Sequence, residues 1–398
     1  MIVLSGADVV LPDRILRPGT VILEGDRIVD VAEGARRAGG SDPHIDLHRH
    51  LVVPGFIDVH VHGVEGTDTL DSETAVRTIA ARLPRFGVTA FCPTSLACSP
   101  RVLERLLRSV RAARTNGSGA ARVLPAHLES NFISPEYKGA QPLECLRLPH
   151  GKVEGDFSGA DILEVIAAAR SEVGIVTIAP ELDGAIDLIR DLAAHGHHIS
   201  LGHSGASYEE ALAGIGAGAR QATHLFNRMT PLNHRQPGLA AAVLDRDEIT
   251  TEVVCDAVHV HPSMVRLALT AKTPSRFMAI TDGTAGSGMP RGTQTAIGGR
   301  RITVGDIASL DDGTIAGSVL TMDQAFAKLV TVMGVSVLDA ATVCATTPAR
   351  ALGLNDTGFV AKDAIADLAV LDYDFRITHT FIGGNLVEPS RTEPGRTQ

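Results

Sequence analysis

Between residues 54 and 359, short apolar runs alternate with longer segments in which apolar residues recur every three or four positions. The short runs are typical of strands buried on both faces, and the longer periodicity is typical of helices that cover a sheet. Ser72 and the pair Ser207 and Glu210 stand where N-caps of two helices are expected. The predicted strands are Phe56–His62, Val88–Thr94, Val123–Glu129, Ile175–Pro180, His198–His203, Gln221–Phe226, Glu252–Val258 and Phe277–Thr281. The predicted helices are Ser72–Phe86, Arg101–Thr115, Asp161–Glu172, Asp183–His195, Ser207–Gly218, Met322–Met333 and Val337–Cys344.

This alternation of strands and crossover segments predicts an α/β fold, a (β/α)8 TIM barrel, with a doubly wound sheet as the alternative. The stretch from Asp282 to Asp312 is Gly-rich and longer than an ordinary connection. We therefore expect it to be an irregular loop that acts as an active-site lid.

The two ends of the chain carry further strand patterns, with a polar loop from Gly34 to Pro43 and a hairpin signal at Gly25-Asp26. Neither end has enough strands for an independent sheet, so we expect both to combine into one small β-sandwich. The predicted domains are residues 1–53 with 360–398, which form the sandwich, and residues 54–359, which form the barrel. The strands predicted for the sandwich are Met1–Val10, Thr20–Leu23, Arg27–Val31, His50–Val53, Asp367–Asp372 and Thr378–Val387.

Composition limits the classes of function that the protein can have. The formal net charge of −10 argues against a nucleic-acid-binding surface, because such surfaces are basic, so an anionic substrate would need a local basic pocket. No apolar run approaches the roughly 20 residues that span a bilayer, and the N-terminus lacks the pattern of a secretory signal. The five cysteines are odd in number and scattered, which predicts reduced thiols in a cytoplasmic protein.

Side chains that can bind metals stand at the C-terminal ends of five predicted strands. His60 and His62 end the first strand and, being one residue apart, project from the same face. Strand ends converge on one mouth of a barrel, where the active sites of this fold lie. A single such histidine is more often a hydrogen-bonded core residue, but six groups from five strands predict a metal centre. The other four groups are Glu129, His203, His224 and Asp282.

Imidazole and carboxylate ligands suit one or two divalent ions, with zinc favoured and iron or manganese as alternatives. We expect His203 and His224 to hold one ion and the pair His60 and His62 to hold a second. Glu129 can bridge the two ions.

Asp282 is the carboxylate placed to act as a general base, and it can also bind the second ion. A metal-bound water of near-neutral pKa is a nucleophile, and a free carboxylate beside it can take its proton. These groups therefore predict hydrolysis of an amide, ester or similar bond.

Motifs around these strand ends extend over nearly the whole chain. They are Pro54-Gly55-Phe56-Ile57-Asp58, His127-Leu128-Glu129, Gly202-His203-Ser204, Thr223-His224-Leu225-Phe226-Asn227, Asp256 to His259, Thr281-Asp282, and Gly317-Ser318 ahead of Leu320-Thr321-Met322. With them the chain resembles the amidohydrolase superfamily and, within it, the N-acetylglucosamine-6-phosphate deacetylases. His-x-His alone is typical of the superfamily, and the remaining motifs are typical of the deacetylase branch.

The resemblance implies removal of acetate from a 2-acetamido sugar 6-phosphate. It implies that Glu129, His203 and His224 bind the main metal and that Asp282 shuttles the proton. It further implies that Arg235 holds the phosphate of a substrate bound in a neighbouring subunit, and hence a homodimer. The predicted substrate-binding residues are Ala140, Gln141, Asn227, Arg228, Arg235, His259, Ile315, Ala316 and Gly317.

Some positions depart from the family pattern. Gln141 stands where the family has a histidine that polarises the acetyl carbonyl, and a second metal ion could compensate for the weaker neutral donor. Ser130-Asn131-Phe132 replaces Gly-Pro-Phe, and Arg228 replaces a small residue, so it either adds to a phosphate pocket or caps a loop. Of His259 and His261, we expect His259 to face the site and His261 to be structural.

Three other functions are compatible with parts of this pattern. The first is a deacetylase for N-acetylgalactosamine 6-phosphate. The second is an amidohydrolase acting on a cyclic amide, against which Glu129 argues, because such enzymes commonly bridge their metals with a carboxylated lysine. The third is a non-catalytic assembly protein, which would be expected to have lost metal ligands.

Overall fold

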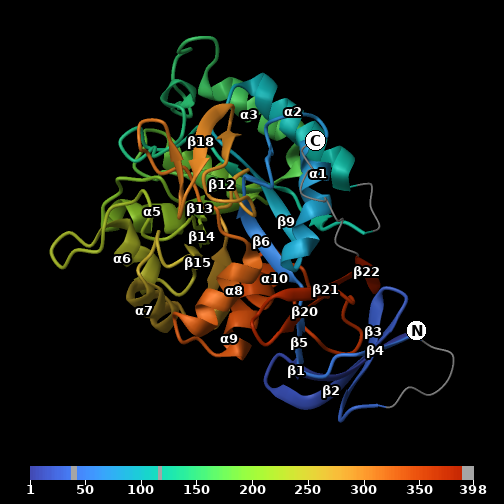
Figure 1. Ribbon diagram of the computed structural model, residues 1–398. Coiled ribbons are helices and arrows are strands. Elements are labelled where there is room, and N and C mark those ends of the chain that lie inside the picture. Colours follow the sequence, from blue (N-terminus) through green and yellow to red (C-terminus); the bar gives the residue numbers. More distant parts are fainter. Residues whose placement is uncertain (37–42, 115–118, 388–398) are drawn as a thin grey trace.

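The structure is a computed structural model that describes residues 1–36, 43–114 and 119–387. Its largest part is a barrel of parallel strands with helices around it, as Figure 1 shows for β6, β9 and β12 to β15 at the centre. The barrel strands are β6 (Phe56–Val61), β9 (Val88–Ser95), β11 (Ala126–Glu129), β12 (Val173–Ile178), β13 (His198–Leu201), β14 (Gln221–Ala222), β15 (Thr250–Val254) and β16 (Phe277–Ile280).

The strands pair in chain order, each parallel to the next, from β6 through β9 to β16. The backbone closes the ring just beyond β16, where the amide of Asp282 donates to the carbonyl of His60 at 2.9 Å. The amide of His62 donates in turn to the carbonyl of Gly283 at 2.8 Å. Closure brings the C-terminal ends of all these strands to one mouth.

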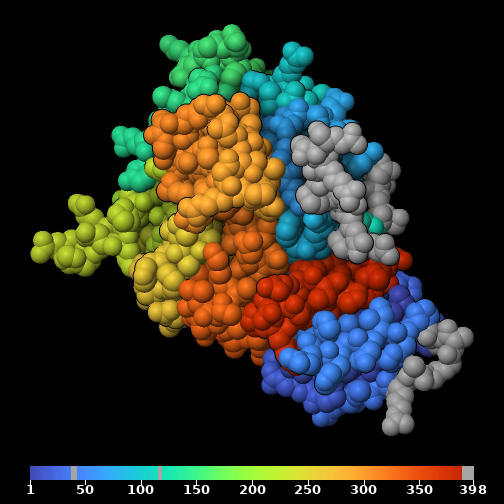
Figure 2. Space-filling model, viewed as in Figure 1, coloured from blue at the N-terminus to red at the C-terminus, as the bar shows by residue number. Residues whose placement is uncertain are grey.

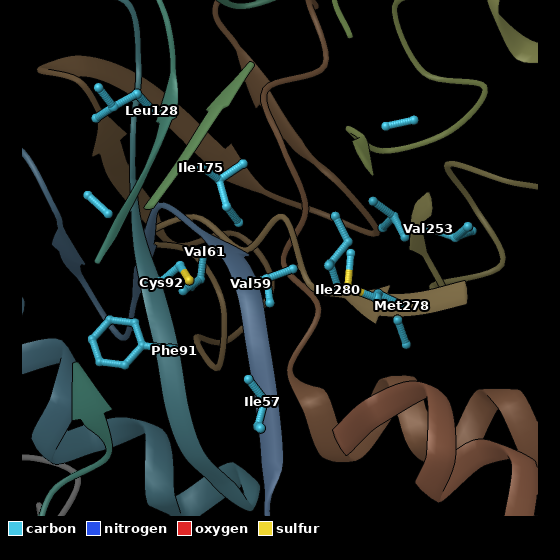
Figure 3. Close-up of a cluster of buried hydrophobic side chains, with 14 of the residues drawn as sticks. Ile57, Val59, Val61, Phe91, Cys92, Leu128, Ile175, Val253, Met278 and Ile280 are labelled. Carbon is cyan, nitrogen blue, oxygen red and sulfur yellow. The ribbon is translucent and has the colours of Figure 1, made fainter. Parts of the chain in front are cut away.

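Both faces of the barrel strands are buried, which explains why most of their residues are apolar. All six residues of β6 are buried. Figure 3 shows Ile57, Val59 and Val61 of β6 packed among side chains of the neighbouring strands. The predicted strand Val123–Glu129 is divided into β10 (Arg122–Val123) and β11, because Pro125 lies between them and has no backbone N–H to donate.

The helices lie outside the barrel, and several of them begin at a side-chain cap. Ser207 and Glu210 form the predicted capping box of α5. The prediction that Ser72 caps α1 is wrong, since Thr74 precedes that helix without a side-chain cap. Ser72 instead accepts a hydrogen bond from the amide of Thr74, two residues on, as serines in turns do. The helices are α1 (Ala75–Arg82), α2 (Pro100–Arg114), α3 (Gly159–Ala168), α4 (Ala185–Ala194), α5 (Tyr208–Ala217), α6 (Gly238–Asp245), α7 (Pro262–Lys272), α8 (Met322–Thr331), α9 (Val337–Ala341) and α10 (Thr347–Ala351).

The stretch from Asp282 to Asp312 is more regular than predicted. It contains a three-stranded antiparallel sheet of β17 (Gln294–Ile297), β18 (Arg300–Val304) and β19 (Ala308–Leu310). Gly298 and Gly299 both have positive φ and form a two-residue hairpin turn between β17 and β18. The glycines that suggested an irregular loop therefore serve a tight turn.

Both ends of the chain meet in a second, eight-stranded sheet. Its antiparallel pairing of β20 with β5 joins the two ends, and Figure 1 shows the blue and red strands side by side. The sheet has its own core, which includes Val21, Ile28 and Phe381. Its strands are β1 (Ile2–Val10), β2 (Ile15–Glu24), β3 (Arg27–Glu33), β4 (His44–Asp46), β5 (His50–Pro54), β20 (Leu368–Asp372), β21 (Ile377–Ile382) and β22 (Asn385–Val387).

The predicted fold class, a (β/α)8 barrel with a small β-sandwich built from both termini, is confirmed. The predicted domain boundaries stay a prediction. Residues 388–398 of the predicted sandwich, residues 37–42 of the polar loop and Thr115 of a predicted helix lie outside the described residues. Among the described helices, none combines the length and apolar character needed to cross a bilayer.

Candidate metal centre and active site

The six predicted metal-binding groups meet at the mouth of the barrel. His60 belongs to β6 and Glu129 ends β11, so strand geometry alone fixes where their side chains point. His203, His224 and Asp282 each follow a strand by two residues and have positive φ angles of 47°, 30° and 48°. That backbone conformation is unfavourable for residues with a Cβ, and it is often found where a site requires it.

Glu129, His203 and His224 form the tighter of two groups. Oε1 of Glu129 lies 2.7 Å from Nε2 of His203 and 2.9 Å from Nε2 of His224. The two imidazole nitrogens are 3.0 Å apart. All three residues are buried, and their ligand atoms are close enough together to bind one ion.

His60, His62 and Asp282 form the second group beside the first. The Nε2 atoms of His60 and His62 are 3.3 Å apart, and Oδ1 of Asp282 lies 3.4 Å from the first and 3.3 Å from the second. Oε2 of Glu129 lies 3.6 Å from Nε2 of His62. Glu129 is therefore within reach of both groups, as the predicted bridge requires.

Hydrogen bonds on the far side of the imidazole rings show that this cluster suits a cation. Nδ1 of His203 lies 2.8 Å from the carbonyl oxygen of Tyr137, which can only accept, so Nδ1 carries the proton. Nε2 of a neutral His203 then directs a lone pair at the carboxylate of Glu129. The lone pairs of this nitrogen and of the carboxylate point at each other and repel unless a cation lies beside them. Nδ1 of His62 and Nδ1 of His224 have no partner among the described residues.

The electrostatics agree with this chemistry. Burial lowers the pKa of His60, but the carboxylates of Asp282, Glu252 and Glu129 outweigh burial and raise it to about 10. Burial likewise opposes ionisation of Glu129, yet His203 and its neighbours hold the pKa of Glu129 well below its ordinary value. The site thus favours carboxylates and positive charge together, which is the donor set that a divalent ion requires.

A third group of possible ligands, His60, His127 and Glu252, lies deeper in the barrel. Both nitrogens of His127 already have partners, the carbonyl of Val59 at 3.0 Å and the hydroxyl of Thr177 at 2.8 Å. His127 therefore has no free nitrogen for a metal ion and instead supports the strands around the site. Glu252 and its neighbour Gln221 were not predicted as site residues. The available signal was an acidic residue in a buried strand that otherwise contains only threonine and valine.

A cavity of about 410 Å³ opens onto the metal-binding groups, a size typical of small-ligand sites. Ala316 is buried and does not line the cavity. Arg235 does not line it either and is exposed on the segment between β14 and α6, which Figure 2 shows projecting in yellow-green from the left side. The predicted substrate-binding residues that do line the cavity are Ala140, Gln141, Asn227, Arg228, His259, Ile315 and Gly317.

Gln141 is buried and both ends of its amide have partners. Its Oε1 accepts a hydrogen bond from the amide of Ala97 at 2.8 Å, which fixes the orientation of the side chain. Its Nε2 therefore points to Glu129 and donates to Oε2 of that carboxylate. Gln141 contacts a predicted metal ligand as well as the cavity.

Arg228 is the only lysine or arginine among the residues that line the cavity. Its side chain lies over Gly139, where an added Cβ would be 2.9 Å from Nε of Arg228. Within the described part of the chain, its guanidinium has no hydrogen-bonding or ion-pair partner. Arg228 therefore offers the cavity an uncompensated positive charge.

His259 lines the cavity, whereas His261 does not. Nδ1 of His259 lies 2.5 Å from Oδ2 of Asp256, and its Nε2 has no partner among the described residues. Burial lowers the pKa of His259, but Asp256 outweighs burial and holds the pKa above its ordinary value. His261 is exposed and accepts a hydrogen bond from the amide of Ser263 at the start of α7.

Comparison with known proteins gives consistent results. Residues 51–387 match the sequence profile of the amidohydrolase family. N-acetylglucosamine-6-phosphate deacetylase of Bacillus subtilis (strain 168) is 34% identical, with 84% of each chain covered. N-acetylgalactosamine-6-phosphate deacetylase of Escherichia coli O157:H7 is 31% identical, with 84% of this chain and 87% of that protein covered. A mutant N-acetyl-D-glucosamine-6-phosphate deacetylase from Mycobacterium smegmatis, solved with N-acetyl-D-glucosamine-6-phosphate, is 33% identical with a TM-score of 0.87, and the match covers 97% of this chain and 99% of that one.

Proposed function

Because the chain belongs to the amidohydrolase family, we propose that its cavity deacetylates N-acetylglucosamine 6-phosphate, giving glucosamine 6-phosphate and acetate. The observation that carries the proposal is the meeting of four imidazoles and two carboxylates at the floor of a cavity whose only lysine or arginine is Arg228. A site of this kind combines the groups for amide hydrolysis with a charge for a phosphate.

Glu129, His203 and His224 would hold the main divalent ion, and His60 and His62 would hold a second. Zinc is the favoured ion, because imidazole and carboxylate ligands suit it, and iron and manganese are the alternatives. An ion bound there supplies a Lewis acid and lowers the pKa of a water molecule.

Asp282 is the proton carrier of the proposed reaction. Burial raises its pKa, but His60 and His62 outweigh burial and hold the pKa below its ordinary value, so Asp282 is a carboxylate. As a carboxylate it accepts a proton from the attacking water and gives that proton to the leaving amine nitrogen. Its place beside the cavity leaves it accessible to both groups.

The remaining cavity residues would position the sugar. Nε2 of His259 is free for a hydroxyl or carbonyl group of the substrate, and Asn227 also lines the cavity. Ala140, Gln141, Ile315 and Gly317 line the cavity and would enclose the acetamido group.

Two arginines are candidates for the 6-phosphate. Arg228 lines the cavity of its own subunit, whereas Arg235 is exposed on a projecting segment. Arg235 can serve a cavity only by reaching into a neighbouring subunit, so its predicted role entails a homodimer. We place the reaction in the cytoplasm, because the five cysteines are free, as in a reducing compartment.

Acetate release from a panel of acetamido sugars, each with and without a 6-phosphate, tests the proposal. N-acetylglucosamine 6-phosphate should be the preferred substrate, and activity should disappear on metal removal and return with added zinc. The proposal would be contradicted if the metal-loaded protein hydrolysed none of the phosphorylated sugars.

N-acetylgalactosamine 6-phosphate is the second candidate substrate, because a relative with that named activity is 31% identical over most of the chain. The two sugars differ only in the orientation of one hydroxyl group. Their ratio of kcat/KM in the same panel decides between them.

A further inference from the structure

Glu252 lies in β15 and is fully buried. A carboxylate in such a position costs free energy unless its oxygens accept hydrogen bonds. Its Oε2 lies 2.9 Å from Nδ1 of His60, and its Oε1 lies 2.5 Å from Nε2 of Gln221. Gln221 stands on the neighbouring strand β14, where it pairs with Thr250, so Gln221 and Glu252 lie on one face of the sheet.

These contacts decide which nitrogen of His60 carries a proton. A carboxylate oxygen accepts, so Nδ1 of His60 donates to Glu252, and Nε2 is the nitrogen left to bind a metal ion. That nitrogen faces Nε2 of His62 at 3.3 Å and Oδ1 of Asp282 at 3.4 Å.

We propose that Glu252 and Gln221 form a positioning pair that holds His60 in the tautomer and orientation needed to bind a metal beside His62. Gln221 fixes the plane of the carboxylate, and the carboxylate fixes the imidazole ring. The proposal rests on the metal centre of the proposed function and deepens it by assigning a support to one of its two sites.

The positioning pair acts on only one site. In the Glu129 group, His203 is oriented by the carbonyl of Tyr137. No contact with Glu252 holds His203 or His224 within the described residues. Disturbing Glu252 should therefore weaken the second ion and leave the first in place. Partners of this kind typically change metal affinity by about 10-fold to 100-fold.

Two variants separate positioning from the other roles that a buried carboxylate could have. Glu252→Asp keeps the negative charge but shortens the side chain by one methylene, so its oxygen no longer reaches Nδ1 of His60. The exchange Glu252→Gln with Gln221→Glu keeps the composition but moves the charge to position 221. The new carboxylate there accepts from the amide nitrogen at position 252 and turns the amide oxygen towards His60.

The experiment measures zinc equivalents by elemental analysis and zinc affinity by competition with a chelator, with circular dichroism as a check of folding. Wild type should bind two equivalents, and His60→Ala should define the one-equivalent state. We expect the second zinc to bind about 10-fold to 100-fold more weakly in Glu252→Asp and to bind nearly as in wild type in the exchanged pair.

The reverse pattern would overturn the proposal, because it would show that the charge at position 252 matters and the acceptor does not. Equal weakening of both variants would assign Glu252 a packing role, and unchanged affinity in both would assign it none, and either result refutes the positioning pair. A wild-type protein that binds fewer than two zinc ions would instead contradict the second metal site itself, and this outcome is visible before any variant is made.

Discussion

Replacing Arg228 with alanine is the most informative test of how the protein recognises a phosphate. The Arg228 side chain lines the cavity and lies over Gly139, and its guanidinium has no partner among the described residues. A phosphate would give it one, in an overall acidic protein with a net charge of −10 that otherwise repels anions. Arg228→Ala should therefore weaken recognition of the phosphate and leave the chemistry intact.

The size of the effect follows from the contact. A hydrogen bond to a charged group contributes roughly 1.5–3 kcal/mol, which corresponds to about 10-fold to 150-fold in kcat/KM. Most of this should fall on KM, because the phosphate is remote from the reacting amide. The unphosphorylated sugar should change little, so the preference for the phosphorylated sugar should fall by the same factor.

The assay is acetate release from N-acetylglucosamine 6-phosphate and from N-acetylglucosamine, for wild type, Arg228→Ala, Arg228→Lys and Arg235→Ala. Arg228→Lys keeps the charge without the planar fork, so it should recover part of the loss. An undiminished preference for the phosphorylated sugar in Arg228→Ala would refute this role of Arg228. A loss confined to Arg235→Ala would then support the predicted contribution from a neighbouring subunit, which sedimentation of the protein as a dimer can check.

Four further predictions address the metal centre and the barrel. His203→Ala should lose bound metal and activity together while circular dichroism stays unchanged; full activity in a metal-free variant would contradict the assignment. Asp282→Asn should lower kcat by about 10² to 10⁴, since the amide cannot accept the proton, and a change of less than about tenfold would remove Asp282 as the base. Gln141→His should remain active. The activity of the wild type should rise with added zinc until the site at His60 and His62 is filled; a plateau at one zinc equivalent, together with an active His60→Ala variant, would contradict this dependence. Gly55→Ala should reduce the free energy of unfolding by about 1–3 kcal/mol in urea, because the added Cβ would overlap Thr89; unchanged stability would show that the strands shift to make room.

The fold could be predicted because its strands are buried on both faces and therefore stand out as short runs of mostly apolar residues. The places of the six candidate metal ligands could be predicted for a related reason, since they stand at strand ends that a barrel brings to one mouth. The predictions that failed concerned segments whose sequence is compatible with more than one local structure. Glycines between Asp282 and Asp312 were compatible with a loop or a tight hairpin, and only the pairing of β17 with β18 decides between them.

Supporting contacts could not be predicted, because they depend on which side chains meet across the barrel. Glu252 and Gln221 lie 31 residues apart in the chain, and Glu252 and His60 lie 192 residues apart. The loop that carries Gln141 is similar in this respect, because the amide of Ala97 fixes the orientation of the Gln141 side chain. A sequence pattern shows that such residues are polar, but not where their hydrogen bonds go.

Glu129 connects these separate features. Its Oε1 faces His203 and His224, while its Oε2 accepts from Gln141 and lies 3.6 Å from His62. A shift of this one carboxylate therefore alters both candidate metal sites and one wall of the cavity. Residues that share a partner do not act independently, so the effects of changes at Gln141 and at the His60 and His62 pair should not add. The departure at Gln141 is thus best understood as a change in how Glu129 is held, and its consequence for the substrate follows from the metal centre.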